Sequence, residues 1–132
     1  MDAVSRGAGT DISEVNRRAW IVGALLLTPL AAWAHAFPDH CDPRVGHTVD
    51  AAPAEVRIWF DGEIEPVFSK IRVESASGQR VDKGDGHVDT KDKTLLAASL
   101  QPGLGTGKYR VYWSVIARDG HLTEGDYPFR IK

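Results

Sequence analysis

Apolar residues recur at every second position in several short stretches of the sequence after residue 35. A spacing of two residues is the period of a strand with one buried face, and no window of this region keeps a helical period. Turn-forming pairs such as Asp61-Gly62 and Ser77-Gly78 separate the stretches. The chain is therefore predicted to be all-β.

The alternation predicts about seven short strands in an antiparallel sandwich or barrel. Clear alternation is seen around Val56–Phe60 and Ile71–Val73 and in Thr94–Leu100, Lys108–Ala117 and Tyr127–Ile131, with weaker strands near His47–Asp50 and Gln79–Asp82. In the longest predicted strand, Lys108–Ala117, one face carries the side chains of Tyr109, Val111, Trp113 and Val115. The predicted core combines Val56, Ile58 and Phe60 with Val111, Trp113 and Val115.

The first 34 residues have a different character. Arg17 and Arg18 precede an apolar run over residues 19–30, and a small-x-small motif ends at Ala34. This order is typical of a signal peptide cleaved after Ala34, and the arginine pair also permits twin-arginine export. The run is shorter than the roughly 20 residues of a spanning helix, so a retained anchor is the less favoured alternative. We expect residues 1–34 to be removed and residues 35–132 to form one exported domain.

The net charge and the counts of cysteine and methionine exclude some partners and ligands. The net charge is −2 and the charges of both signs are interspersed, so no basic face is available for nucleic acid. Cys41 is the single cysteine, which excludes an internal disulfide. Met1 is the single methionine and is lost with the signal peptide, so the exported domain has no thioether ligand.

Cleavage after Ala34 makes His35 the first residue. An N-terminal histidine offers its α-amine and its ring Nδ1 to one metal ion. Copper(II) prefers tetragonal nitrogen and oxygen donors and has the highest affinity in the divalent series, so this chelate suits copper(II) best. Taken alone, His35 is also simply the residue that follows a cleavage site.

Asp119-Gly120-His121 follows the longest predicted strand. Residues two apart in an extended chain point to the same side, and glycine lets the backbone turn, so this carboxylate and imidazole can face one ion. An ordinary Asp-Gly turn with an exposed histidine would have the same sequence. Asp85-Gly86-His87 repeats the triplet without a long apolar strand before it, so the spacing alone does not choose between the two.

The order of motifs along residues 35–132 resembles the CopC copper resistance family. The motifs are His35-Ala36, Pro43 and Gly46, Ala52-Pro53 before Val56–Phe60, the Gly107–Val115 strand, Asp119-Gly120-His121 and Gly125–Phe129. The resemblance implies an immunoglobulin-like, Greek-key β-sandwich in the periplasm that binds one copper(II) ion per chain. It also favours Asp119 and His121 over the earlier triplet, because the family's motif follows the Tyr-x-Val-x-Trp strand.

The ligands implied by the resemblance are His35, by its amine and Nδ1, with Asp119 and His121. Glu63 is a weaker candidate, because some members place an acidic residue near copper shortly after the phenylalanine of the early strand. The implied function is that of a monomeric carrier that sequesters copper in copper resistance and homeostasis and delivers it to an inner-membrane copper transporter. The family's methionine-rich copper(I) site has no counterpart here.

Two other functions stay open at this point. A histidine-brace copper monooxygenase uses a similar N-terminal histidine, although Asp119 would occupy the position where oxygen must bind. A metal-free interaction module is the second alternative.

Cys41 is expected to be a small core residue rather than a copper(I) ligand, and His40 and His47 are expected at the surface.

Overall fold

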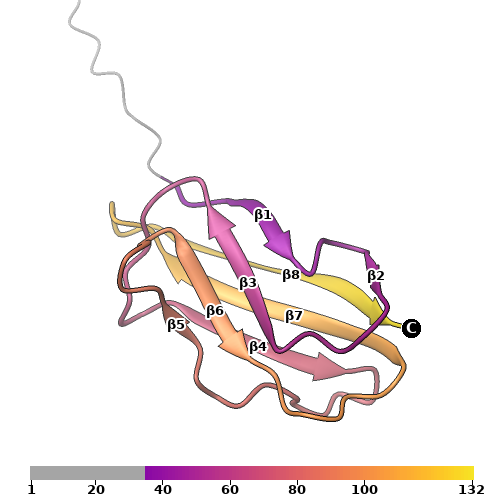
Figure 1. The fold of residues 1–132 in the computed structure, drawn as a ribbon. Helices are drawn as coiled ribbons and strands as arrows, with labels where there is room; N and C mark the ends of the chain where they lie inside the picture. The colour runs from indigo at the N-terminus through magenta and orange to yellow at the C-terminus, as the bar shows by residue number, and fades with distance from the viewer. Residues whose placement is uncertain (1–34) are drawn as a thin grey trace, which may run out of the picture. The chain divides into compact units, whose positions relative to one another are not determined.

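A computed structural model describes residues 35–132, and two four-stranded sheets face each other in it (Figure 1). One sheet has the order β1 (Pro38–Asp42), β3 (Glu55–Phe60), β6 (Leu95–Ser99) and β5 (His87–Val88). The other has the order β2 (Thr48–Val49), β8 (Leu122–Ile131), β7 (Gly107–Ile116) and β4 (Lys70–Ser75). All pairs are antiparallel apart from β2 with β8. The predicted all-β sandwich is confirmed.

No helix that could cross a membrane occurs among residues 35–132. The predicted signal peptide, residues 1–34, lies outside the described residues.

The predicted strands agree with the structure wherever one face is buried. The segments predicted at Thr94–Leu100 and Lys108–Ala117 correspond to β6 and β7. β8 begins five residues before the predicted Tyr127, because its first half is largely exposed and has no apolar alternation. The predicted strand at Gln79–Asp82 is wrong, since only isolated bridges form there. β1 and β5 were not predicted, because each carries only one buried residue.

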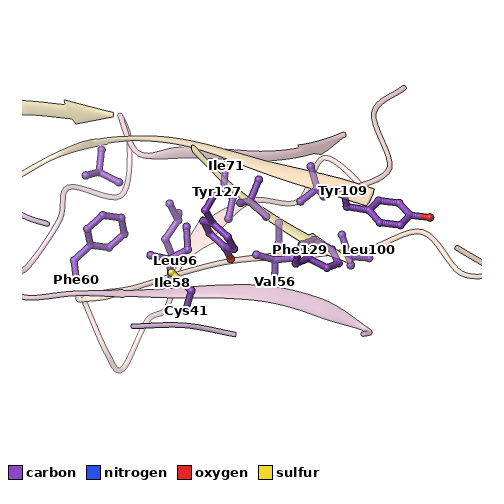
Figure 2. Close-up of a cluster of buried hydrophobic side chains, with 14 of the residues drawn as sticks. Cys41, Val56, Ile58, Phe60, Ile71, Leu96, Leu100, Tyr109, Tyr127 and Phe129 are labelled. Atoms are coloured by element: carbon purple, nitrogen blue, oxygen red, sulfur yellow. The ribbon is translucent and has the colours of Figure 1, made fainter. Parts of the chain in front are cut away.

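The core lies between the sheets, where side chains from β1, β3 and β6 meet those from β4, β7 and β8 (Figure 2). Five of the six predicted core residues are buried. Trp113 is only partly buried and packs against the core at its edge, with its ring 5.3 Å from that of Phe60. A Cβ atom at the facing Gly125 would lie 2.7 Å from the Trp113 ring, so the indole occupies the space that glycine leaves. The predicted register of β7 is correct, but Trp113 closes the core rather than filling its centre.

The β7–β8 hairpin is the longest element pair of the fold. Its two ten-residue strands pair from Gly107 with Ile131 to Ile116 with Leu122, which leaves residues 117–121 as the connecting turn. The Asp119-Gly120-His121 triplet therefore lies in the hairpin turn at one end of the sandwich.

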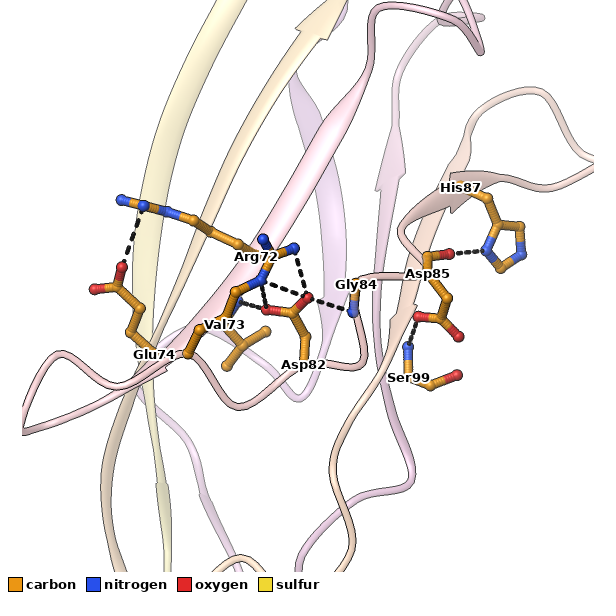
Figure 3. A network of polar contacts seen from close by, with 9 residues as sticks. Arg72, Val73, Glu74, Asp82, Gly84, Asp85, His87 and Ser99 are labelled. Carbon is orange, nitrogen blue, oxygen red and sulfur yellow. Dashed lines mark hydrogen bonds and ion pairs between the residues drawn. The ribbon is translucent and has the colours of Figure 1, made fainter.

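Asp82 lies beside β4 in a polar cluster at the sheet edge (Figure 3). Its side chain is fully buried and accepts hydrogen bonds from the Val73 and Gly84 backbone N–H groups and from the Arg80 guanidinium, all at 2.8–3.0 Å. Burial alone would raise the pKa of Asp82, but the hydrogen bonds from Arg80, Val73 and Gly84 outweigh burial and lower it. The carboxylate thus joins the 80–84 segment to β4.

We predict that Asp82→Ala lowers the free energy of unfolding at pH 7 by roughly 1–3 kcal/mol, because it leaves the buried Val73 N–H without its acceptor. The folded pKa of Asp82 lies below the unfolded value of about 3.9, so its contribution is complete above that value and is lost as the pH falls through the folded pKa. Urea unfolding from pH 7 to pH 2 should show wild type and variant converging at the acid end. A constant difference across this range would contradict the assignment.

Candidate metal centre

Three potential metal ligands converge at the end of the sandwich where β7 passes into β8. One ligand atom each from His35, Asp119 and His121 lies within 4.8 Å of the other two. His35 belongs to the segment before β1, whereas Asp119 and His121 belong to the hairpin turn. The structure therefore brings together the three residues expected from the sequence.

Local hydrogen bonds shape the turn that carries two of the ligands. The Ala117 N–H donates to the His121 carbonyl at 2.9 Å, and Gly120 has a φ of 89°, a left-handed conformation that glycine adopts without strain. One Asp119 carboxylate oxygen accepts from the His121 backbone N–H at 3.0 Å. The other lies 2.9 Å from His121 Nδ1. The hydrogen bonds of the turn thus orient the carboxylate and the imidazole toward each other.

A second set of hydrogen bonds holds the segment that carries His35, residues 35–37, which we call the N-terminal arm. The Thr123 hydroxyl donates to the Ala36 carbonyl at 2.7 Å. The Phe37 N–H donates to the Asp61 carboxylate at 2.7 Å, and the Asp61 N–H donates to the Phe37 carbonyl at 2.9 Å. Ala36 is fully buried. These contacts place the His35 ring edge-on to the His121 ring, with centroids 4.6 Å apart.

Sequence reasoning did not identify the two residues that anchor the arm. Asp61 was interpreted only as part of an Asp-Gly turn, and Thr123 lies in the half of β8 that shows no apolar alternation. No local pattern reveals either role, because both depend on contacts between segments distant in sequence.

The electrostatics of the turn favour an ionised carboxylate. The hydrogen bond from the His121 backbone N–H lowers the pKa of Asp119 most and burial opposes it, while the hydrogen bond from the His121 side chain and the attraction of the His121 and His35 imidazoles lower the pKa further. The Asp119 side chain is 26% exposed and that of His121 is 63% exposed. A metal ion at this site would be accessible from solvent and would have one anionic and two imidazole donors within reach.

Glu63 is not a member of the three-residue group. Its carboxylate accepts a hydrogen bond from Arg118 at 2.6 Å, and its carbonyl accepts one from the Arg118 N–H at 3.2 Å. Ile64 forms an isolated bridge with Ala117 beside this pair. Glu63 is therefore engaged in attaching the 63–65 segment to the start of the ligand turn.

The second triplet has a different structural role. The Asp85 carboxylate accepts from the Ser99 N–H at 2.8 Å, and His87 Nδ1 lies 2.9 Å from the Asp85 carbonyl (Figure 3). A Cβ atom at Gly86 would lie 2.7 Å from the Ile71 side chain, so this glycine is required by close packing. The triplet fastens a loop to β6.

The other histidines and the cysteine lie outside the group. His40 is exposed and stacks on Trp59 with ring centroids 4.4 Å apart, and His47 is exposed as predicted. Cys41 is buried in the core, and burial raises the pKa of its thiol. A buried thiol that resists ionisation is a poor metal ligand, which agrees with its expected role as a core residue.

The family model for the CopC domain matches residues 39–132. The chain belongs to the CopC family. The family expected from the order of motifs is confirmed, and with it the sandwich fold.

Relatives of known name support this membership. Protein YobA of Escherichia coli K12 is 31% identical over 112 residues, covering 85% of this chain and 90% of YobA. Copper transport protein CutJ of Bacillus subtilis is 31% identical over 118 residues, covering 88% of this chain but only 22% of CutJ. The crystal structure of CopC from Methylosinus trichosporium OB3b superposes with a TM-score of 0.65 and 31% identity, over 74% of this chain and 94% of that one.

We predict that the pKa of Asp119 stays below the ordinary value of about 3.9 in the metal-free His121→Ala variant. The largest cause of the lowering is the backbone N–H of residue 121, which alanine retains. Removal of the imidazole should raise the pKa only part of the way. Carbon-13 NMR titration of the Asp119 carboxyl carbon measures this directly. A return to the ordinary value in the variant would show that the imidazole alone is responsible.

Proposed function

We propose that this CopC-family protein is exported to the periplasm, holds one copper(II) ion per chain and carries it to an inner-membrane copper transporter. The observation that carries the proposal is the convergence of His35, Asp119 and His121, with ligand atoms within 4.8 Å of one another. His35 would bind through its α-amine and Nδ1, and Asp119 and His121 would complete the set.

The donor set explains why copper(II) is the ion of choice. An amine, two imidazoles and a carboxylate can lie in one plane around copper(II), whereas zinc(II) prefers a tetrahedron and gains nothing from planarity. The name of the Bacillus subtilis relative, copper transport protein, supports copper as the metal. Residues 35–132 contain no methionine, and Cys41 is buried, so a soft copper(I) site has no ligands among them.

The proposal requires the chain to begin at His35, because only then is an α-amine available at the site. The sequence before His35 has the order of a signal peptide that ends at Ala34. Ala36 is buried and hydrogen-bonded to Thr123, so a chain that started at His35 would keep its first residue next to an anchored one. Removal of residues 1–34 would therefore leave a terminal histidine on an anchored arm.

Carriage fits the geometry better than oxidation chemistry. The Asp119 carboxylate belongs to the group, so it would occupy a coordination position that an oxygen-activating copper centre keeps open. A blue-copper centre needs a thiolate beside two histidines, whereas the group has none. We infer a binding role without catalysis.

Adding one alanine before His35 of the exported protein should lower the affinity for copper(II) by orders of magnitude. The extension converts the His35 amine into a peptide nitrogen while leaving the folded domain unchanged. His121→Ala should also weaken binding strongly, whereas His87→Ala is the matched control, because His87 is held by the Asp85 carbonyl away from the group. Competition titrations with electron paramagnetic resonance report both affinity and nitrogen coordination. Unchanged affinity in the extended protein would refute the amine ligand.

Thr123→Val should weaken copper(II) binding by about three- to tenfold, because it removes the hydrogen bond that holds the Ala36 carbonyl while keeping the side chain's shape. Thr123→Ser retains the hydroxyl and should bind as the wild type does. Unfolding of the metal-free proteins provides the control for general damage. Equal affinities of the valine and serine variants would show that the arm does not need this contact.

A further inference from the structure

Exposed apolar side chains gather at the end of the sandwich that carries the candidate metal centre. Among residues 35–132 the large apolar side chains that are more than half exposed are Phe37, Val45, Val67, Phe68 and Leu122. Four of these five belong to segments at the end of the sandwich that carries the metal-ligand group. Single exposed apolar residues are common on any protein, but a cluster of them marks an interaction site.

The contacts of each segment establish this placement. Phe37 follows His35 in the arm, with its ring 6.1 Å from the His35 ring, and Leu122 directly follows His121. Val67 and Phe68 lie in the turn that follows Glu65, whose N–H donates to the Ile116 carbonyl at 2.8 Å. Ile116 is the β7 partner of Leu122. The arm, the 65–69 turn and the ligand turn thus share one end of the fold (Figure 1). We call Phe37, Val67, Phe68 and Leu122 the apolar rim.

Acidic residues border the apolar rim. Asp61 contacts the arm, Asp119 belongs to the group, and Glu63 and Glu65 line a small groove with Lys93 and Arg118. Lys93, Arg118 and the exposed Lys70 add positive charge at the same end, Arg118 is paired with Glu63, and a bound copper(II) ion would offset further negative charge. Binding to anionic lipid needs a cluster of basic residues, which this end lacks, whereas an apolar patch bordered by charges of both signs is typical of a protein interface.

We propose that the apolar rim is the docking surface for a copper acceptor protein, whose matching face is apolar and bordered by charged side chains of both signs. This proposal rests on the proposed carriage of copper(II). A copper ion held by several ligands passes to another protein by stepwise ligand exchange, so the acceptor's donors must come within coordination distance. The docking face must therefore include the metal site, and the apolar rim lies at the same end of the fold.

One of the named relatives supports a protein occupant. The match with CutJ covers 88% of this chain but 22% of CutJ, so in that copper transport protein a domain of this kind is part of a longer chain. A domain that is covalently joined to further protein there would need a corresponding contact surface when it occurs on a separate chain.

Val45 offers a matched control for the test. It is as exposed as Phe68 but lies in the β1–β2 turn. The neighbouring Gly46 donates to the Pro128 carbonyl at 2.7 Å. Pro128 is six residues along β8 from Leu122, or roughly 20 Å at about 3.3 Å per residue. Val45→Ser therefore removes the same kind of side chain far from the metal site.

The experiment compares copper transfer from the loaded, exported protein to washed spheroplasts of its host bacterium and to the chelator EDTA. The variants are Val67→Ser with Phe68→Ser, Leu122→Ser, and Val45→Ser. Copper affinity and the resonance spectrum are recorded for each variant before transfer. We expect transfer to spheroplasts to fall about tenfold in the two rim variants and to be unchanged in Val45→Ser, while transfer to EDTA stays constant in all.

Three results would overturn the docking surface. The rim variants could transfer copper to spheroplasts as fast as the wild type does, or the wild type could transfer it no faster than it releases copper spontaneously. Transfer could also survive protease treatment of the spheroplasts. The last result would indicate lipid as the occupant. Failure of the wild-type protein to take up copper(II) in the preceding titration would overturn the carrier function itself, and so is distinguishable from a failure of docking.

Discussion

The pairing register of β7 with β8 is the constraint on which the candidate site depends. Tyr109, Val111 and Val115 are buried on one face of β7, and a shift by one residue would turn all of them toward solvent. The register therefore fixes which five residues form the turn, and so the position of Asp119 and His121. It also fixes Thr123 opposite Val115, from where its hydroxyl reaches the Ala36 carbonyl. Packing of the core thus positions all three ligands.

The strands in which apolar residues alternate with polar ones could be predicted from the sequence. Alternation is a property of a strand with one buried face, so β3, β4, β6 and β7 were predictable, whereas β1 exposes four of its five residues and was not. Residues in turns show no periodic pattern, so their contacts could not be predicted in this way. In Asp61-Gly62-Glu63, the sequence could not tell that Asp61 would bind the arm and Glu63 would bind Arg118. Resemblance suggested Glu63 as a weak ligand candidate, and the three-residue group does not include it.

The two Asp-Gly-His triplets show why spacing did not suffice. Gly120 adopts a left-handed conformation in a hairpin turn, which leaves the Asp119 carboxylate and the His121 imidazole directed at each other. In the other triplet the Asp85 carboxylate is used by a β6 backbone N–H and the imidazole of His87 by a carbonyl. The difference comes from what lies beside each triplet in three dimensions. Only the order of motifs along the whole chain, through the family resemblance, carried that information in the sequence.

The two halves of the site differ in how firmly they are held, and this difference suits a carrier. Asp119 and His121 lie in a turn closed by the longest ladder of the fold, whereas His35 depends on a short arm held through Thr123, Asp61 and the buried Ala36. Opening the arm breaks few contacts and leaves the sheets intact, so it costs less than global unfolding. A bound ion would pull the equilibrium toward the closed arm, and loss of the His35 donors would start its release. If the protein carries copper as proposed, the arm would be the point where an acceptor begins to exchange ligands, without any change in the sandwich.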